Sequence, residues 1–252
     1  MTGGELRRRL QEGPALIGTF LQSPSAITAE LVASLGVDFT CVEAEHSAIG
    51  VETMQALVAA SALGGAPALV RVRRNDPGEI AAALDAGAAG VIVPRVDSAG
   101  EAREAVAAGR YPPAGERGLG PSRAAGYGRN IAGYFAAAND EVLIGVQIES
   151  AAAVDHAAEI VAVPGIDFAF VGPGDLAVSL GVPFGDAALL SAVESVLDVG
   201  REAGVPCGIW APGPQQARHW TGLGVTILIL NSDLGLLTEA LERALAETRA
   251  PQ

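Results

Sequence analysis

The chain contains no lysine, because all sixteen of its basic residues are arginines. A lysine amine is the group that forms a Schiff base with a carbonyl substrate, so enzymatic chemistry of that kind is excluded. The 29 acidic residues give a formal net charge of −13, and no run of basic residues is longer than the three arginines at positions 7–9. Nucleic acids and anionic membrane surfaces are therefore not expected as partners.

Cysteine is scarce as well, since Cys41 and Cys207 are the only two and lie far apart in the chain. Each falls within an apolar run, which favours two buried free thiols over a disulfide. No apolar stretch reaches the roughly 18 to 20 residues that span a bilayer. The arginine-rich start of the chain lacks the apolar segment of a signal peptide. We therefore expect a cytoplasmic protein that neither crosses nor binds a membrane.

What the chain does have is a regular alternation of two patterns. Short apolar runs alternate with longer segments of helical period, which indicates βα units around a parallel sheet buried on both faces. Eight runs are interpreted as strands, at residues 16–21, 37–43, 68–71, 90–93, 143–149, 168–171, 207–210 and 226–230. Eight strands close a barrel, and about 250 residues is a usual length for one. The sequence predicts a single α/β domain, a (β/α)8 TIM barrel, over residues 1–252.

The segments between these strands contain residues that commonly begin or end helices. They predict helices at residues 25–34, 50–63, 76–86 and 98–108, an N-terminal helix within residues 1–14 and a C-terminal helix within residues 234–252. Residues 110–140 form a long stretch rich in glycine, proline and arginine, which is typical of a functional or mobile loop. Its Arg117, Arg123 and Arg129 are expected to face the mouth of the barrel or a neighbouring subunit.

Two carboxylates stand at the ends of predicted strands. Glu149 closes the fifth strand, and Asp175 follows the sixth in a Gly-Pro-Gly-Asp turn. The carboxyl ends of barrel strands surround one mouth, where barrel enzymes have their active sites. Hard cations such as Mg²⁺ and Mn²⁺ prefer carboxylate and water ligands. The pair is therefore a candidate metal site, with two solvated strand-end charges as the alternative.

Further polar side chains belong to the same mouth. His46 follows the second strand beside two acids and is a candidate general base, although an ordinary loop histidine fits equally well. Arg71 ends the third strand, and its planar fork suits a carboxylate or an enolate oxygen. Arg73 has the same strand parity and is the alternative. Gln147 shares the inward face with Glu149, where an amide can bond substrate or a metal-bound water.

Five motifs, in this order, resemble the HpcH/HpaI family of metal-dependent class II pyruvate aldolases. They are Glu43-Ala-Glu-His46, Val70-Arg71, Arg110-Tyr-Pro-Pro-x-Gly-x-Arg-Gly118, Val146-Gln-Ile-Glu149 and Val171-Gly-Pro-Gly-Asp175. Members are (β/α)8 barrels of the phosphoenolpyruvate/pyruvate superfamily that cleave 4-hydroxy-2-oxo acids, such as 4-hydroxy-2-oxoheptanedioate or 2-keto-3-deoxy acids, to pyruvate and an aldehyde. The resemblance implies a homo-oligomer, a hexamer or trimer, that exchanges the C-terminal helix between subunits.

The resemblance also implies roles for individual residues. Glu149 and Asp175 would hold the divalent cation, Mg²⁺ or Mn²⁺, with Co²⁺ as a further option. Arg71 would stabilise the pyruvate enolate, and His46 with Glu43 would belong to the base machinery. The pyruvate pocket would be lined by Gln147, Gly172, Pro173 and Gly174.

One position departs from the family pattern, which usually has aspartate where this chain has Glu43. In the family that aspartate partners the histidine, so the additional methylene is expected to move the carboxylate by about 1 Å and weaken a positioned proton transfer. Phe20 stands where members often have tryptophan, and it is expected to shape the aldehyde side together with Trp210. Two alternatives stay open: an oxaloacetate decarboxylase or citrate-synthase-like condensing enzyme with the same metal-enolate core, and a non-catalytic barrel.

Overall fold

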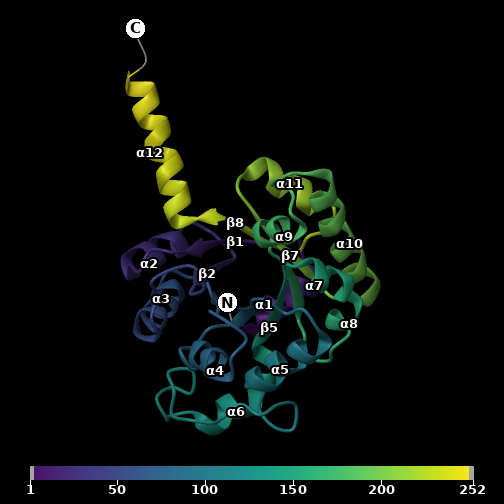
Figure 1. Ribbon diagram of the computed structural model, residues 1–252. Helices are drawn as coiled ribbons and strands as arrows, with labels where there is room; N and C mark the ends of the chain where they lie inside the picture. The colour runs from purple at the N-terminus through teal and green to yellow at the C-terminus, as the bar shows by residue number, and fades with distance from the viewer. Residues whose placement is uncertain (1–2, 250–252) are drawn as a thin grey trace.

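The computed structural model describes residues 3–249 and confirms the (β/α)8 barrel. All eight strands are parallel and pair in sequence order, and β1 closes the barrel against β8 (Figure 1). The strands are β1 (Leu16–Leu21), β2 (Phe39–Glu43), β3 (Ala68–Arg71), β4 (Gly90–Val93), β5 (Leu143–Ile148), β6 (Phe168–Val171), β7 (Cys207–Ala211) and β8 (Ile227–Ser232). Each predicted strand end lies within two residues of the observed one.

The helices surround the barrel, with α1 before the first strand and α12 after the last. They are α1 (Gly3–Glu12), α2 (Ala26–Ser34), α3 (Val51–Leu63), α4 (Pro77–Asp85), α5 (Ala99–Gly109), α6 (Ile131–Glu141), α7 (Ala151–Asp155), α8 (Ala157–Val161), α9 (Pro173–Leu180), α10 (Ala187–Ala203), α11 (Pro214–Gly222) and α12 (Asp233–Arg249). The predicted terminal helices include residues 1–2 and 250–252, which lie outside the described residues. None of the helices within residues 3–249 is long and apolar enough to cross a bilayer.

Residues 110–140 differ most from their prediction. Their last part belongs to α6, which the sequence hides because the weak helix former Gly133 lies in its first turn. Arg117 pairs with Asp85 at the end of α4, and Arg123 donates to a carbonyl one residue later. Because α4 runs antiparallel to the strands, both arginines lie at the amino end of the barrel. The expectation that they face its mouth is wrong for their own barrel.

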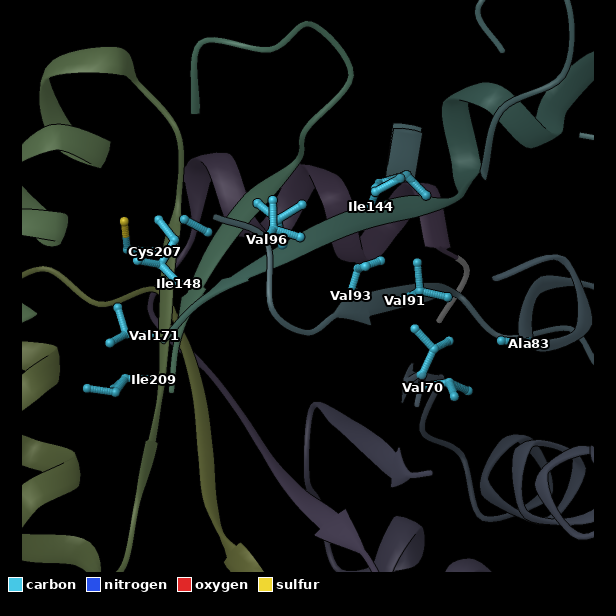
Figure 2. Close-up of a cluster of buried hydrophobic side chains, with 14 of the residues drawn as sticks. Val70, Ala83, Val91, Val93, Val96, Ile144, Ile148, Val171, Cys207 and Ile209 are labelled. Atoms are coloured by element: carbon cyan, nitrogen blue, oxygen red, sulfur yellow. The ribbon is translucent and has the colours of Figure 1, made fainter. Parts of the chain in front are cut away.

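Alternate strand residues separate two hydrophobic cores. Inward residues such as Leu69, Ile92 and Phe168 fill the barrel, and Leu6 of α1 closes its amino end. Outward residues pack beneath the helices, as Figure 2 shows for Val70, Val91, Ile144 and Val171. At the carboxyl end of the barrel, the last inward-facing position of each strand lies beyond the apolar core. The polar residues of the predicted site occur at these positions.

The two cysteines lie on opposite sides of the barrel wall. Cys41 belongs to the inner core and Cys207 to the outer one, and both are free thiols, as predicted. Burial raises the pKa of both thiols, that of Cys207 to about 11. Neither is therefore a nucleophile near neutral pH.

Candidate active site

Glu149 is the most buried carboxylate of the predicted metal pair, with 5 % of its surface exposed. Its Oε1 accepts a hydrogen bond from the backbone N–H of Arg95 at 2.8 Å, and its Oε2 accepts one from Nε2 of Gln147. Both donors are neutral. Burial raises the pKa of Glu149 to about 7, because these two bonds do not offset the loss of water and nearby Glu45 and Asp175 raise it further.

Asp175 lies in the first turn of α9, where the sequence had indicated an isolated turn. β6 ends at Val171, Gly172 is the N-cap, and Pro173 takes the first helical position, where its fixed φ and missing N–H are tolerated. The exposed carboxylate of Asp175 therefore stands at the positive end of a helix dipole. This position places the carboxylate at the pocket in the mouth of the barrel.

Gly172 lies between the two carboxylates, because it caps the helix that carries Asp175 and packs against Gln147 and Glu149. A Cβ at this position would lie 2.8 Å from both Nε2 of Gln147 and Oε2 of Glu149. Any larger residue would displace the amide and the carboxylate together. Gly174, by contrast, meets nothing within 4 Å and opens onto the pocket.

Glu43 is fully buried and pairs with Arg71. Its Oε2 lies 2.5 Å from both Nε and Nη2 of Arg71. Its Oε1 accepts the backbone N–H groups of Glu45 and His46 at 2.8 and 2.9 Å. Burial by itself would lower the pKa of Arg71, but Glu43 raises it, so the guanidinium stays charged. The expected pairing of Glu43 with the imidazole is therefore not what the structure has: Glu43 holds the guanidinium and the loop backbone.

The imidazole of His46 faces a different acid. Its Nε2 lies 3.7 Å from Oε2 of Glu45, and about half of the side chain (49 %) is exposed to solvent. The Glu45 side chain is 6 % exposed, and its Oε2 has no hydrogen-bond partner among residues 3–249. Burial raises the pKa of Glu45, although Arg71 and His46 lower it.

The choice between the two candidate arginines is settled by their contacts. Arg73 turns away from the mouth, to the carboxylate of Glu79 and the carbonyl of Ile49. Arg71 is 11 % exposed and stacks 4.6 Å from the ring centre of Phe20. Arg71 is thus the arginine of the pocket.

These side chains open onto a pocket of about 220 Å³, lined by Phe20, Gln22, His46, Arg71, Phe170, Gly172, Pro173, Gly174, Asp175, Trp210, Asn231 and Ser232. Sequence reasoning missed Gln22, Phe170, Asn231 and Ser232. Strand parity could have found two of them, because Phe170 and Asn231 each lie two residues from an inward neighbour.

The donor set at the mouth fits a hard divalent cation. Glu149 is a buried carboxylate with neutral partners only, and Oε1 of the buried Gln147 has no hydrogen-bond partner. No group of three or more histidine, cysteine, aspartate or glutamate side chains within residues 3–249 is arranged to hold an ion. A cation on Glu149 and Asp175 would therefore complete its shell with substrate oxygens and water, as Mg²⁺ commonly does.

Comparison with known proteins gives a consistent result. The family model described as HpcH/HpaI aldolase/citrate lyase matches residues 16–240. The 2-keto-3-deoxy-L-rhamnonate aldolase of Escherichia coli O157:H7 is 36% identical over 244 residues, which cover 95% of this chain and 91% of the relative. Among solved structures, an HpcH/HpaI aldolase/citrate lyase family protein from Burkholderia cenocepacia J2315 superposes with a TM-score of 0.94 at 35% identity, over 98% of this chain and 100% of that one. The citrate synthase SbnG superposes with a TM-score of 0.88 at 29% identity, over 97% of each chain. This chain belongs to the HpcH/HpaI aldolase/citrate lyase family.

Proposed function

We propose that this protein is a divalent-metal-dependent, class II aldolase. It would reversibly cleave a 4-hydroxy-2-oxo acid into pyruvate, or a related 2-oxo acid, and an aldehyde. Family membership supports carbon–carbon lyase activity. The observation that carries the metal assignment is the buried carboxylate of Glu149, which has only neutral partners and stands near Asp175. The lysine-free sequence leaves no Schiff-base route.

Glu149 and Asp175 are the residues that would hold Mg²⁺ or Mn²⁺, with Co²⁺ as a further option. When bound, such a cation supplies Lewis-acid polarisation of the 2-oxo group of the substrate. Gln147 fixes the Glu149 carboxylate through Nε2, and its unpartnered Oε1 is available to accept from a hydroxyl or a water. Gly172 keeps the space that this arrangement requires.

Arg71 would hold the negative charge that develops on the enolate when the C3–C4 bond breaks. Its guanidinium is fixed by Glu43 and by the ring of Phe20 before any substrate arrives. A charge already oriented toward the developing anion needs no reorganisation during the reaction. Glu43 is a positioning residue in this account, since it acts through Arg71.

His46 would remove the proton of the 4-hydroxyl in the cleavage direction and return it in the condensation. Its half-exposed ring lines the pocket, so that a substrate hydroxyl can reach it. Glu45, 3.7 Å away, would stabilise the imidazolium formed by that transfer. Oε1 of Glu43 accepts the backbone N–H of His46, and this hydrogen bond fixes the loop that carries the imidazole.

The test uses protein stripped of metal with a chelator and then supplied with Mn²⁺. We expect pyruvate release from 4-hydroxy-2-oxo acids only with the metal, and a loss of at least about 100-fold in kcat for Glu149→Gln, since such a cation contributes several kcal/mol. Glu194→Gln, at an exposed position on α10, is the matched control and should keep wild-type rates. Full activity of the metal-free protein would contradict the proposal.

A second candidate keeps the same residues and changes the electrophile. One structural relative is a citrate synthase at 29% identity, which favours oxaloacetate as an alternative 2-oxo acid, condensed with an acyl thioester or decarboxylated. The same assay distinguishes it, because decarboxylation releases carbon dioxide from oxaloacetate without any aldehyde. A non-catalytic barrel would give neither product. A scaffold also has no need of the Glu43–Arg71 pair beside Glu149 and Asp175.

We also propose that the protein is a homo-oligomer in which α12 packs on another subunit. Figure 1 shows α12 projecting away from the barrel, and it exposes Leu234, Leu236, Leu237, Leu241 and Leu245. Light scattering should find an oligomer for the full chain. Replacing Leu237, Leu241 and Leu245 by serine should yield the monomer, and an unchanged mass would contradict this packing.

A further inference from the structure

A second pocket lies behind the wall of the active-site pocket, and we call it the annex. It measures about 370 Å³, within the range of small-molecule sites. Pro173 and Trp210 line both the annex and the active-site pocket. The remaining walls include Phe184 before α10, Leu190 and Val193 on α10, and Trp220 on α11. Figure 1 shows these helices grouped beside β7, on one side of the barrel.

The annex differs from the active-site pocket in charge. None of the described residues that line it is an aspartate, a glutamate or an arginine, and its polar side chains are those of Gln216 and His219. The active-site pocket, in contrast, presents the charged side chains of Arg71 and Asp175. A charged tail would gain no ion-pair partner in the annex, whereas an apolar tail would be removed from water against its apolar walls.

Trp210 forms the partition between the two pockets. It is the next-to-last residue of β7. Its indole Nε1 donates to the carbonyl of Asn231 at 3.3 Å, and its ring meets Phe184 edge-on with the ring centres 6.4 Å apart. Pro173 lies two residues before Asp175. The annex therefore begins at the same short segment that carries a proposed metal ligand, and a chain leaving the reacting carbon would enter it past Trp210 and Pro173.

We propose that the annex binds the apolar tail of the aldehyde, so that the preferred substrates are 4-hydroxy-2-oxo acids with an alkyl or aryl substituent at C4. This inference rests on the proposed aldolase function and specifies its substrate class. In the condensation, C3 of pyruvate loses one proton to His46, the resulting enolate carbon forms a bond to the aldehyde carbon as the C=O π bond opens, and the aldehyde oxygen takes that proton back from His46. No other reactant is consumed, so the annex contributes binding alone.

Direct binding can be measured without catalysis, because Trp210 and Trp220 are the only tryptophans of the chain and both line the annex. The probe is 6-bromohexan-1-ol, which has no carbonyl group and whose bromine quenches tryptophan fluorescence on contact. We expect saturable quenching in metal-free protein, reversed by heptan-1-ol and not by glycerol. Linear quenching with the slope of free tryptophan would overturn the proposal.

Selectivity is the second readout. With pyruvate and Mn²⁺, kcat/KM should rise about fourfold for each methylene from propanal to heptanal, the value expected for burying a methylene. Leu190→Trp fills the annex and should reduce the ratio of heptanal to propanal rates at least about tenfold. Ser191→Trp adds the same side chain at the exposed neighbouring position and should keep the wild-type ratio.

The outcomes separate this inference from the function on which it rests. Turnover of propanal with no rise toward heptanal would leave the aldolase standing and overturn the annex as its tail site. Saturable quenching without turnover of any aldehyde would overturn the substrate role, because an apolar ligand would then bind there for another purpose. A ratio equally reduced in Ser191→Trp would assign the effect to α10 as a whole and would also overturn it.

Discussion

The two ends of the barrel both bury a carboxylate, but they treat it differently. At the amino end, Asp167 lies 2.6 Å from both Nη1 of Arg7 and Nη2 of Arg110 and accepts the backbone N–H of Ile144. At the mouth, Glu149 has an amide and a backbone N–H as partners and no guanidinium. Asp167, which is paired with two guanidinium groups, stabilises the fold. Glu149, which has only neutral hydrogen-bond donors, can accept an added cation. The comparison predicts opposite effects when each charge is removed.

Removing the charge at the amino end should produce the largest change in stability. Asp167→Asn would leave Arg7 and the buried Arg110 without their carboxylate. Breaking a buried ion pair on one side costs about 3–5 kcal/mol, so we expect that loss in the free energy of unfolding, measured by urea denaturation. The kcat/KM of the folded variant should stay within about twofold of wild type. A stability equal to wild type would remove the contrast between the two ends.

Removing the charge at the mouth should have the opposite sign. The pKa of Glu149 is about 7 in the folded protein and 4.5 as a free group, so the folded state holds a proton that the unfolded state has released between these values. Its contribution to stability is therefore present below pH 4.5 and is lost as the pH rises through 7. We expect metal-free Glu149→Gln to be more stable than wild type by about 1–3 kcal/mol at pH 8 and by little at pH 5.

Thermal unfolding of the two proteins across this range, with chelator present, is the measurement. Glu194→Gln serves as the control, because its carboxylate is exposed on α10 and should give the wild-type curve. A stabilisation by Glu149→Gln that does not depend on pH would contradict the burial argument.

Exchanging the guanidinium of the mouth for an ammonium should affect turnover next most strongly. Arg71→Lys keeps the charge but loses the fork that Oε2 of Glu43 holds at both Nε and Nη2. We expect kcat to fall at least about tenfold in steady-state assays. Arg73→Lys is the matched control and should stay within about twofold, because Arg73 faces Glu79. Equal losses in both variants would contradict the assignment of Arg71.

The smallest predicted effect concerns the length of one side chain. Because the additional methylene of Glu43 is expected to weaken proton transfer, the sequence alone predicts that Glu43→Asp restores the position of the imidazole and raises the rate. The contacts reverse this expectation, because the carboxylate of Glu43 reaches Arg71 and two backbone N–H groups. A shorter acid would loosen Arg71, and we expect kcat to fall about threefold with an unchanged pH profile. An increase in rate would instead support the pairing with His46.

Strand periodicity explains why the sequence could place several polar side chains at the mouth of the barrel. Side chains alternate along a strand, so Gln147 and Glu149 had to share a face, and Arg71 had to point where Leu69 points. The barrel itself follows from eight apolar runs with helical segments between them. Both inferences depend on local patterns that repeat at fixed spacing.

The features that sequence reasoning missed depend on contacts between distant segments. The partner of Glu43 is decided by the turn after β2, whose backbone N–H groups occupy Oε1. The annex is built from β7, α9, α10, α11 and the loop before α10, and no spacing within any one of them indicates a cavity. Helix α6 was hidden by Gly133, a weak helix former within its first turn.

Calorimetric titration of Mn²⁺ into metal-free protein tests the central claim most directly, because it asks whether the unpaired carboxylates of the mouth hold a cation. We predict one binding site in the wild-type protein and in Glu194→Gln, and no measurable binding in either Glu149→Ala or Asp175→Ala, with circular dichroism showing the fold intact in all four. Unchanged Mn²⁺ affinity in both alanine variants would contradict the account.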